Sequence, residues 1–220
     1  FWIKAQEIIN KEKKIKFFKT HNIYGSLNNT DFSNKYNSIG AVYIIRDPRN
    51  VITSMMNHFE MNKDDALNFM LNEKKFTYDH FKKNDYSDFQ FISSWEKNYK
   101  SWIKNKDFPI KLIKYEDLIN QTFYIVKDLI NFINKTCNLD HNFDKSKAQN
   151  AIETTSFEKL KKIENNHGFS ESIKSKNRDK NKVPFFHLGP NNNWQKIFDP
   201  SFANKLNTIF KETLEELQYH

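Results

Sequence analysis

The stretch VYIIRDPRNVITSMMNHF (residues 42–59) constrains the fold most, because it reads as a strand that runs directly into a helix. A continuous apolar run ends at Arg46, as in parallel strands that are covered on both faces. Asp47 is a favoured N-cap residue and Pro48 suits the first helical position, so we expect a helix over residues 48–59. An arginine therefore stands between a buried strand and a helix N-terminus.

Strands and helices alternate along the rest of the chain. The apolar pattern predicts strands over residues 41–46, 14–22 and 110–118, and helices over 2–14, 91–105, 121–135 and the region after Pro200. A further helix is expected to break near residues 154–157, and residues 165–182 are expected to form a flexible loop. This alternation implies a parallel sheet with right-handed crossovers, hence an α/β fold, and the length suits one domain over residues 1–220.

Composition narrows the partners. The 220 residues carry a net charge of +8, but the lysines are scattered rather than clustered, so no nucleic-acid surface is predicted. The single cysteine excludes an internal disulfide and favours a reducing compartment, the cytoplasm. No apolar run approaches the roughly 18 residues that a membrane span needs. No His, Cys or Asp cluster has the spacing of metal ligands, so no metal is expected.

Ligands of open parallel sheets bind at the carboxyl ends of the strands, which makes the polar groups there candidates. Arg46 lies beside the predicted helix N-terminus, where free N–H groups and the helix dipole favour an anion. Its guanidinium can bind a phosphate through two parallel hydrogen bonds. Ser54, about two turns along the helix, could add a hydroxyl donor. The alternative is an ion pair of Arg46 with an acidic residue on a neighbouring loop.

Two further predicted strand ends carry polar side chains. Lys19 and His21 would share one face of their strand. The lysine disfavours a charged imidazole, which suits His21 as a general base; the alternative is an exposed strand end. Tyr115, Glu116 and Asp117 end another predicted strand, where the tyrosine could stack on a flat ring or cap the core. The two acids could cap the next helix or pair with an arginine.

Five segments together resemble, in the same order, those of the cytosolic-type sulfotransferases: KTH (19–21), YIIRDPRNVITS (43–54), YEDL (115–118), TTSF (154–157) and FFHLGPNNNWQKIF (185–198). The resemblance covers nearly the whole chain. It implies a three-layer domain with a central parallel sheet, similar to the P-loop nucleoside triphosphate hydrolase fold. It also implies that a sulfuryl group passes from the co-substrate 3′-phosphoadenosine 5′-phosphosulfate to a hydroxyl or amine of a small molecule, lipid or glycan.

The resemblance also implies roles for individual residues. Arg46 and Ser54 would hold the 3′-phosphate of the nucleotide. His21 would be the base that takes the acceptor's proton, and Lys19 would lie near the transferring sulfuryl group. The residues that line the adenine and ribose, or close over the 3′-phosphate, would be Tyr115, Thr155, Ser156, Phe157, His187, Leu188 and Gly189.

Departures from the family pattern bear on that site. The family's Arg-Lys-Gly loop reads His187-Leu188-Gly189 here, so two cations are replaced. Either the affinity for the 3′-phosphate is lower, or a cation of the preceding loop reaches in: Lys174, Lys176, Arg178, Lys180 or Lys182. The segment that forms the dimer contact in relatives is not matched, which leaves the oligomeric state open.

The family also has a glycine-rich loop, after its first strand, that cradles the 5′-phosphosulfate through backbone N–H groups. None of the four glycines of this chain fits that loop. The expectation is that residues 1–220 are the carboxyl-terminal majority of a sulfotransferase domain, without its first strand and this loop, and that the fragment alone is inactive.

The acceptor pocket is expected near Met55, Met56, Phe59 and the segment 69–81, which includes Phe81; the alternative is that these side chains serve as core packing. Two other functions compete with sulfuryl transfer. One is a phosphate-loop kinase or related nucleotide-binding protein, and the other is a basic, non-catalytic binding module.

Overall fold

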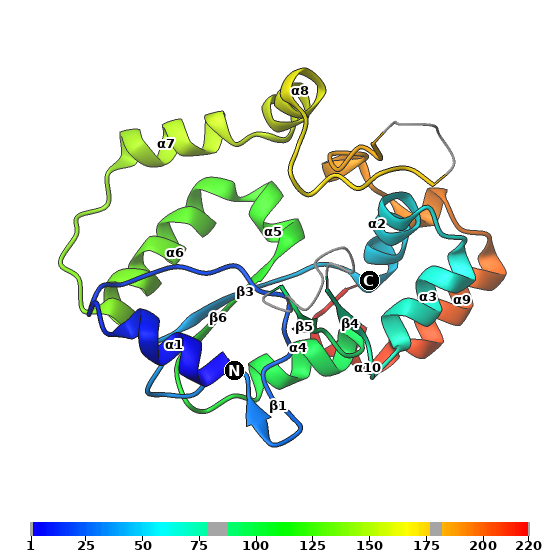
Figure 1. Ribbon diagram of the computed structural model, residues 1–220. Helices are drawn as coiled ribbons and strands as arrows, with labels where there is room; N and C mark the ends of the chain where they lie inside the picture. The colour runs from blue at the N-terminus through cyan, green and yellow to red at the C-terminus, as the bar shows by residue number, and fades with distance from the viewer. Residues whose placement is uncertain (1, 79–87, 177–181, 220) are drawn as a thin grey trace. The chain divides into compact units, whose positions relative to one another are not determined.

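The computed structural model describes residues 2–78, 88–176 and 182–219 (Figure 1). Three of the candidates named above, Phe81, Arg178 and Lys180, lie outside these residues. The chain divides into two compact units. The first comprises Phe1–Ile45, Leu71–Lys114 and Ile125–Phe143, and the second comprises Arg46–Met70, Tyr115–Tyr124 and Asp144–His220. Lys19 and His21 belong to the first unit, and every nucleotide-binding candidate belongs to the second.

The first unit contains a parallel pair of strands, β3 (Ala41–Ile45) and β6 (Ile110–Lys114), which confirms the predicted α/β class. The two strands pair along their whole length, and Figure 1 shows them side by side. Ile113 of β6 is buried in the core. On β3, however, Val42 and Ile44 are 40% and 57% exposed, so the expectation of a strand covered on both faces is wrong.

The remaining elements of the first unit are α1 (Trp2–Asn10), the strand pairs β1 (Ser26–Leu27) with β2 (Thr30–Asp31) and β4 (Phe76–Thr77) with β5 (Gln90–Phe91), and α4 (Trp95–Ile103). Helix α6 (Thr122–Cys137) begins at the end of a second-unit segment and continues in the first unit. The predicted helix over 91–105 is present as the shorter α4, because Phe91 belongs to β5 and Ser94 caps the helix; its buried Tyr99 and Trp102 lie on one face.

The strand predicted over residues 14–22 is not formed. Side chains of α4 bind the backbone at its carboxyl end. Nδ2 of Asn98 donates to the carbonyl oxygen of His21 at 3.0 Å, and Nε1 of Trp102 donates to that of Asn22 at 2.9 Å. Because this stretch has no strand geometry, the argument that Lys19 and His21 share a strand face does not hold.

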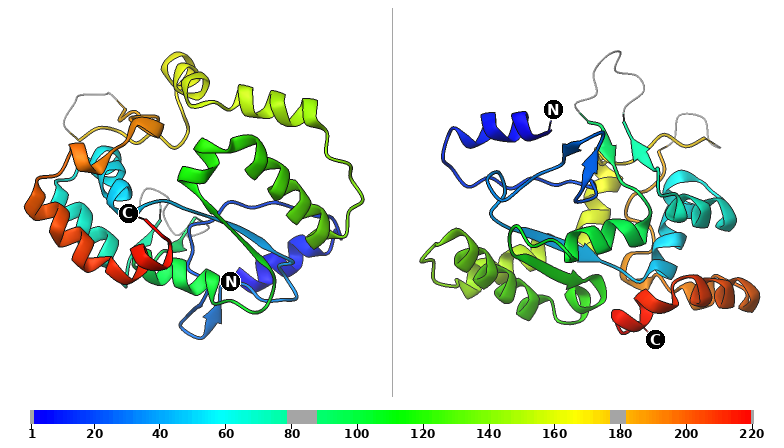
Figure 2. Two further views of the ribbon diagram at one scale, coloured as in Figure 1. Left: turned by 180° about the vertical axis from the view of Figure 1, so that it is seen from behind. Right: turned by 90° about the horizontal axis from the view of Figure 1, so that it is seen from below.

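The second unit is mostly helical. Its elements are α2 (Pro48–Phe59), α3 (Lys63–Leu71, whose last residue falls in the first unit), α5 (Tyr115–Asn120), α7 (Lys145–Thr154), α8 (Phe157–His167), the 3-10 helices η1 (Gly189–Asn191) and η2 (Trp194–Lys196), α9 (Pro200–Ile209) and α10 (Lys211–Glu216). Figure 2 follows the same elements from two further sides.

Helix α2 has the bounds that the sequence predicts. A side-chain oxygen of Asp47 accepts the backbone N–H of Arg49 at 2.9 Å, which satisfies one of the free donors of the first turn. Pro48 occupies the first turn, where the missing N–H costs nothing. The helix ends at Glu60, whose left-handed conformation, with φ of 50°, turns the chain away.

Three other expectations for this unit can be compared with the structure. The predicted break near residues 154–157 is confirmed, since α7 ends and α8 begins there. The predicted strand end at Tyr115, Glu116 and Asp117 is wrong. These residues form the first turn of α5, where acidic side chains interact favourably with the helix dipole. The C-terminal helix is two helices, α9 and α10, which meet at the buried Phe210.

The core of the second unit is built from apolar side chains on α2, α3, α9 and α10, among them Ile52, Leu67, Phe202, Leu206 and Leu214. Within the described residues, no helix has the length and apolar character that a membrane crossing requires.

Candidate functional site

Arg46 is the centre of the predicted nucleotide site. It follows β3 directly in the chain, and Tyr115 follows β6, whose Lys114 pairs with Ile45. The guanidinium carbon of Arg46 lies 4.3 Å from the centre of the Tyr115 ring, and Nη2 donates to the carbonyl oxygen of Gly189 at 3.0 Å. Three predicted site residues that are far apart in the sequence are therefore in contact.

The Nε atom of Arg46 is buried and has no hydrogen-bond partner among the described residues. A guanidinium donor that is removed from water and left unpaired costs about 1–3 kcal/mol, or more because it is charged. Such a donor is suited to an anion that would approach it. The alternative ion pair of Arg46 with an acidic side chain is not formed within the described part of the chain.

The buried ion pair is made by Arg49 instead. Its Nη2 lies 2.7 Å from a carboxylate oxygen of Asp47, and its Nε donates to the same carboxylate at 3.0 Å. Nη1 donates to Oδ1 of Asn207 at 2.9 Å, and the guanidinium lies 4.3 Å from the Trp194 ring. These partners fix the N-terminus of α2, so Arg49 has a structural role beside the site.

Glu116 also holds the start of α2. Its carboxylate accepts the backbone N–H of Asp47 at 3.2 Å and the hydroxyl of Tyr219 at 3.0 Å. Burial, together with nearby carboxylates, raises the pKa of Tyr219, so its hydroxyl stays protonated as a donor. Burial raises the pKa of Tyr115 as well, although the Arg46 charge opposes that shift. Tyr115 is therefore a neutral ring at physiological pH.

Ser54 is an exposed residue of α2 whose hydroxyl donates to the carbonyl oxygen of Asn50 at 3.2 Å, and the loop after Gly189 reaches it through Asn192. The Nδ2 atom of Asn192 donates to the backbone carbonyl oxygen of Asn50 at 3.0 Å and contacts the Ser54 hydroxyl at 3.3 Å. Its Oδ1 accepts the hydroxyl of Thr53 at 2.7 Å. The sequence reasoning missed Asn192, and the run of three asparagines after the loop was the only signal for it.

Gly189 must be a glycine in this fold. Its φ of +54° lies in the left-handed region, which favours glycine. A Cβ atom built on it would lie 2.2 Å from Cε2 of Phe157, so the aromatic ring already fills that space. Phe157 also packs edge-on against Phe186, with ring centres 6.1 Å apart. A fourth predicted site residue, Phe157, is thus in direct contact with Gly189.

The other predicted residues lie next to this cluster in the sequence. Thr155 is the C-cap residue of α7, and its hydroxyl donates to the carbonyl oxygen of Ala151 at 2.7 Å. Ser156 is the N-cap residue of α8 and makes no capping hydrogen bond with its side chain. His187 has its backbone carbonyl bonded to Nζ of Lys161 at 3.1 Å, and Leu188 is half-buried.

Of the loop cations that were candidates to approach the phosphate, Lys176 has its ammonium group engaged elsewhere, and Lys174 and Lys182 are paired through the backbone. Nζ of Lys176 donates to the carbonyl oxygen of Phe59 at 3.3 Å, at the end of α2. Lys174 forms an isolated antiparallel bridge with Lys182 through the backbone.

The proposed general base has a defined backbone position in the first unit. The His21 N–H donates to Oε1 of Gln90 at 2.6 Å, and its carbonyl oxygen accepts from the buried Asn98. Oδ1 of Asn98 in turn accepts the hydroxyl of Tyr43 at 3.0 Å. Bonds on both sides therefore hold the His21 backbone, while its catalytic role and that of Lys19 stay predictions.

The aromatic side chains expected near the acceptor pack within their own units. Phe59 stacks on Phe69 with ring centres 5.2 Å apart, and Phe76 stacks on Tyr78 at 6.0 Å. Met55 and Met56 are half-buried on α2. Among the described residues, no group of three or more His, Cys, Asp or Glu side chains could hold a metal ion.

A separate cavity of about 360 Å³ lies in the second unit. None of the predicted nucleotide-binding residues lines it. Its lining residues are Arg49, Asn207, Lys211, Leu214, Glu215, Gln218 and Tyr219.

Several known proteins are similar to this chain in sequence or in fold. Mouse Sulfotransferase 1B1 is 22% identical over 213 residues, which cover 96% of this chain and 65% of the mouse protein. Among solved structures, mouse sulfotransferase SULT7A1 complexed with PAP has 21% identity and a TM-score of 0.49, covering 79% of this chain and 58% of that one. Retinol dehydratase in a complex with retinol and PAP has 20% identity and a TM-score of 0.49, covering 79% and 47%.

The chain thus spans about two thirds of the length of its mouse relative. The family model of the sulfotransferase domain matches residues 3–218, and this range includes residues of both units. The resemblance inferred from the five ordered segments is confirmed by this match. The chain therefore belongs to the sulfotransferase domain family.

Proposed function

We propose that this protein is a sulfotransferase that uses 3′-phosphoadenosine 5′-phosphosulfate and transfers its sulfuryl group to a hydroxyl or amine. The acceptor would be a small molecule, a lipid or a glycan. The single cysteine of the chain suits a reducing compartment, and we place the reaction in the cytoplasm.

One observation carries the proposal: the unpaired, buried Nε of Arg46 at a cluster of residues that the family assigns to the nucleotide. The same guanidinium contacts Gly189 and Tyr115, and Gly189 contacts Phe157. A 3′-phosphate that accepts from Nε would satisfy this donor through a charge-assisted hydrogen bond. Neighbouring aromatic rings would suit an adenine base.

The reaction would proceed as an in-line transfer. His21 takes the proton of the acceptor hydroxyl or amine as the acceptor atom forms a bond to sulfur. The bond between sulfur and the 5′-phosphate oxygen breaks, and its electron pair leaves with 3′-phosphoadenosine 5′-phosphate (PAP). Lys19 would meet the charge that develops on that oxygen. Hydrogen bonds to both sides of the His21 backbone would limit its motion during proton transfer.

Calorimetry with PAP and with adenosine 5′-phosphate tests the nucleotide site. The wild-type protein should bind PAP more tightly, and Arg46→Ala should reduce that preference. A charged hydrogen bond contributes about 1.5–3 kcal/mol, which corresponds to roughly 10- to 150-fold in affinity. The exposed Lys196→Ala serves as a control of equal charge change. Equal affinity of the wild type for both nucleotides would contradict the proposal, and a preference for ATP would favour the kinase-like alternative.

His21→Ala tests the assigned base separately. Measured on the full-length protein, turnover of an acceptor with the sulfate donor should fall by roughly 10²- to 10⁴-fold, because general base catalysis supplies that much. PAP affinity should stay as in the wild type. Retained turnover would remove His21 from the mechanism without affecting the nucleotide site.

A further inference from the structure

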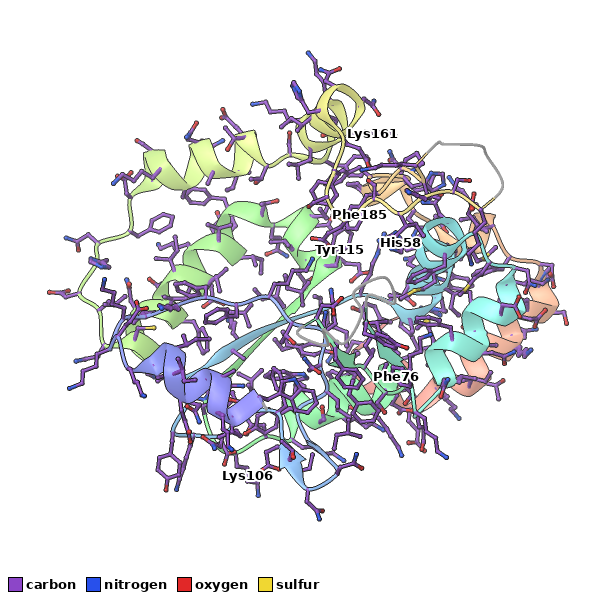
Figure 3. The ribbon with its side chains drawn as sticks, viewed as in Figure 1. His58, Phe76, Lys106, Tyr115, Lys161 and Phe185 are labelled. Atoms are coloured by element: carbon purple, nitrogen blue, oxygen red, sulfur yellow. The ribbon has the colours of Figure 1, made fainter. Side chains whose placement is uncertain are left out.

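One face of α8 holds the loop of residues 185–189 at three points. Phe157, Lys161 and Glu164 recur at a spacing of four and three residues, which places them on the same side of the helix. The Phe157 ring lies against Gly189, and Nζ of Lys161 donates to the carbonyl oxygen of His187 at 3.1 Å. Lys161 can be followed in Figure 3, where it projects from α8.

Glu164 makes the third contact with the loop, and both of its carboxylate oxygens accept hydrogen bonds there. Its carboxylate accepts the backbone N–H groups of Phe185 and Phe186 at 2.7 and 2.9 Å, and the hydroxyl of Ser172 at 2.6 Å. Partial burial opposes ionisation of Glu164, but these hydrogen bonds and the charge of Lys161 outweigh it and lower its pKa. The carboxylate thus serves the loop backbone.

The ammonium group of Lys161 is engaged differently. Its hydrogen bond goes to a neutral carbonyl oxygen, and no carboxylate lies within ion-pair distance of it in the described ranges. Two of its three N–H donors remain for another acceptor. The Nζ atom of Lys161 also lies 5.6 Å from the centre of the Phe157 ring, and Phe157 is the residue that contacts Gly189. The charge of Lys161 interacts with the Glu164 carboxylate one turn along α8, but within the described residues its hydrogen bond at the loop goes to a neutral oxygen.

Lys161 and Arg46 bind the same loop two residues apart. Arg46 donates to the carbonyl oxygen of Gly189, and Lys161 donates to that of His187. The Cα atoms of residues two apart are separated by at most about 7 Å. Both cations therefore bind the same short stretch of backbone, and the long, flexible lysine side chain suits a phosphate that Arg46 holds at this loop.

We propose that Lys161 is the second cation of the 3′-phosphate site, delivered by α8 in place of the cations that His187 and Leu188 replace in the loop. This inference rests on the proposed function. When the phosphate is bound, one of the remaining N–H groups of Lys161 donates to a phosphate oxygen.

The test is a charge series at position 161, measured by calorimetry with PAP and with adenosine 5′-phosphate. Lys161→Met and Lys161→Gln should each weaken PAP binding about 3- to 10-fold, since a partly exposed charged contact is worth less than a buried one. Lys161→Arg should bind PAP as the wild type does. Adenosine 5′-phosphate should bind equally to all four proteins. Lys162→Met, on the next and exposed residue of α8, controls for loss of charge.

The glutamine variant separates a phosphate contact from a role as loop anchor, because its amide can still donate to the His187 carbonyl but carries no charge. Wild-type affinity for PAP in Lys161→Gln would overturn the proposal, as would equal weakening of both nucleotides. The preference for PAP should also fall less with added salt in Lys161→Met than in the wild type. If the wild type itself shows no preference for PAP, the proposed function fails; if it does and Lys161→Met retains it, only this inference fails.

Discussion

Gly189→Ala should destabilise the second unit and weaken the nucleotide binding that we propose for it. The new Cβ would lie 2.2, 2.4 and 2.5 Å from three ring atoms of Phe157, whereas carbon atoms in contact prefer about 3.5–4.0 Å. The ring cannot turn away freely, because it also packs against Phe186. An added methyl group in a packed site costs roughly 1–3 kcal/mol, and alanine at a left-handed φ costs roughly 1–2 kcal/mol more.

The loss is measured by urea unfolding, followed through tryptophan fluorescence, and by the affinity for PAP. We expect about 2–5 kcal/mol less stability, or, if the loop shifts to relieve the contact, loss of the bond from Arg46 and a weaker preference for PAP. Gly25→Ala is the neutral control, since no atom lies within 4 Å of its Cβ position. Gly168→Ala, also in open space but with φ of +74°, isolates the backbone cost.

The outcome that refutes this reasoning is a Gly189→Ala protein that unfolds at the same urea concentration as Gly25→Ala and retains the wild-type preference for PAP. If Gly189→Ala loses only as much stability as Gly168→Ala, the ring of Phe157 moves without cost and the close contact has no energetic role.

Three further substitutions test the framework around the site. Arg49→Met should lower the free energy of unfolding by roughly 3–5 kcal/mol in urea, because it leaves the carboxylate of Asp47 buried without its charged partner. Asn98→Ala should cost about 1–3 kcal/mol by the same measurement, since it removes the donor to the His21 carbonyl and leaves buried groups unpaired. Glu164→Gln should lower the melting temperature at neutral pH, and it should lower it less at pH 3.5. The pKa of Glu164 is lowered in the folded protein, so the ionised carboxylate stabilises the fold above the usual glutamate range. This stabilisation is lost as the pH falls through the folded-state pKa.

Each of these predictions has a matched comparison. Lys63→Met breaks an exposed ion pair with Asp199 and should cost less than about 1 kcal/mol, against which Arg49→Met is judged. Tyr43→Phe removes only the hydroxyl that donates to Asn98 and should have a smaller effect than Asn98→Ala. An unchanged melting curve for Glu164→Gln at neutral pH would show that its bonds to the loop add nothing to stability.

The sequence correctly predicted where strand β3 gives way to helix α2. Asp47 and Pro48 determine the start of α2 through a capping hydrogen bond and a preset φ, both of which depend only on neighbours in the sequence. The same reasoning failed for residues 14–22, where an apolar and polar pattern suggested a strand. A strand needs a partner, and here the backbone groups of His21 and Asn22 are bonded by the side chains of Asn98 and Trp102 instead.

The residues of the candidate site likewise include some that the sequence predicts and some that it does not. Arg46, Tyr115 and Gly189 could be named in advance because the family pattern marks them, and the structure brings them into contact. Asn192 and Lys161 were missed. Their roles depend on partners that are 26 to 142 residues away, and no local pattern in the sequence marks such a pairing.

The two arginines of the RDPR segment show why the fold, and not the residue type, decides which one is available to a ligand. Arg49 is buried against the carboxylate of Asp47, and a further donor goes to Asn207, so its charge is compensated within the protein. Arg46 donates to a neutral carbonyl oxygen and stacks on an aromatic ring, and its Nε is buried without an acceptor. Since the cost of desolvating that donor is already present in the folded chain, an anion that binds there recovers it rather than adding to it. The arrangement of Arg46 is therefore consistent with the 3′-phosphate contact that we propose for it.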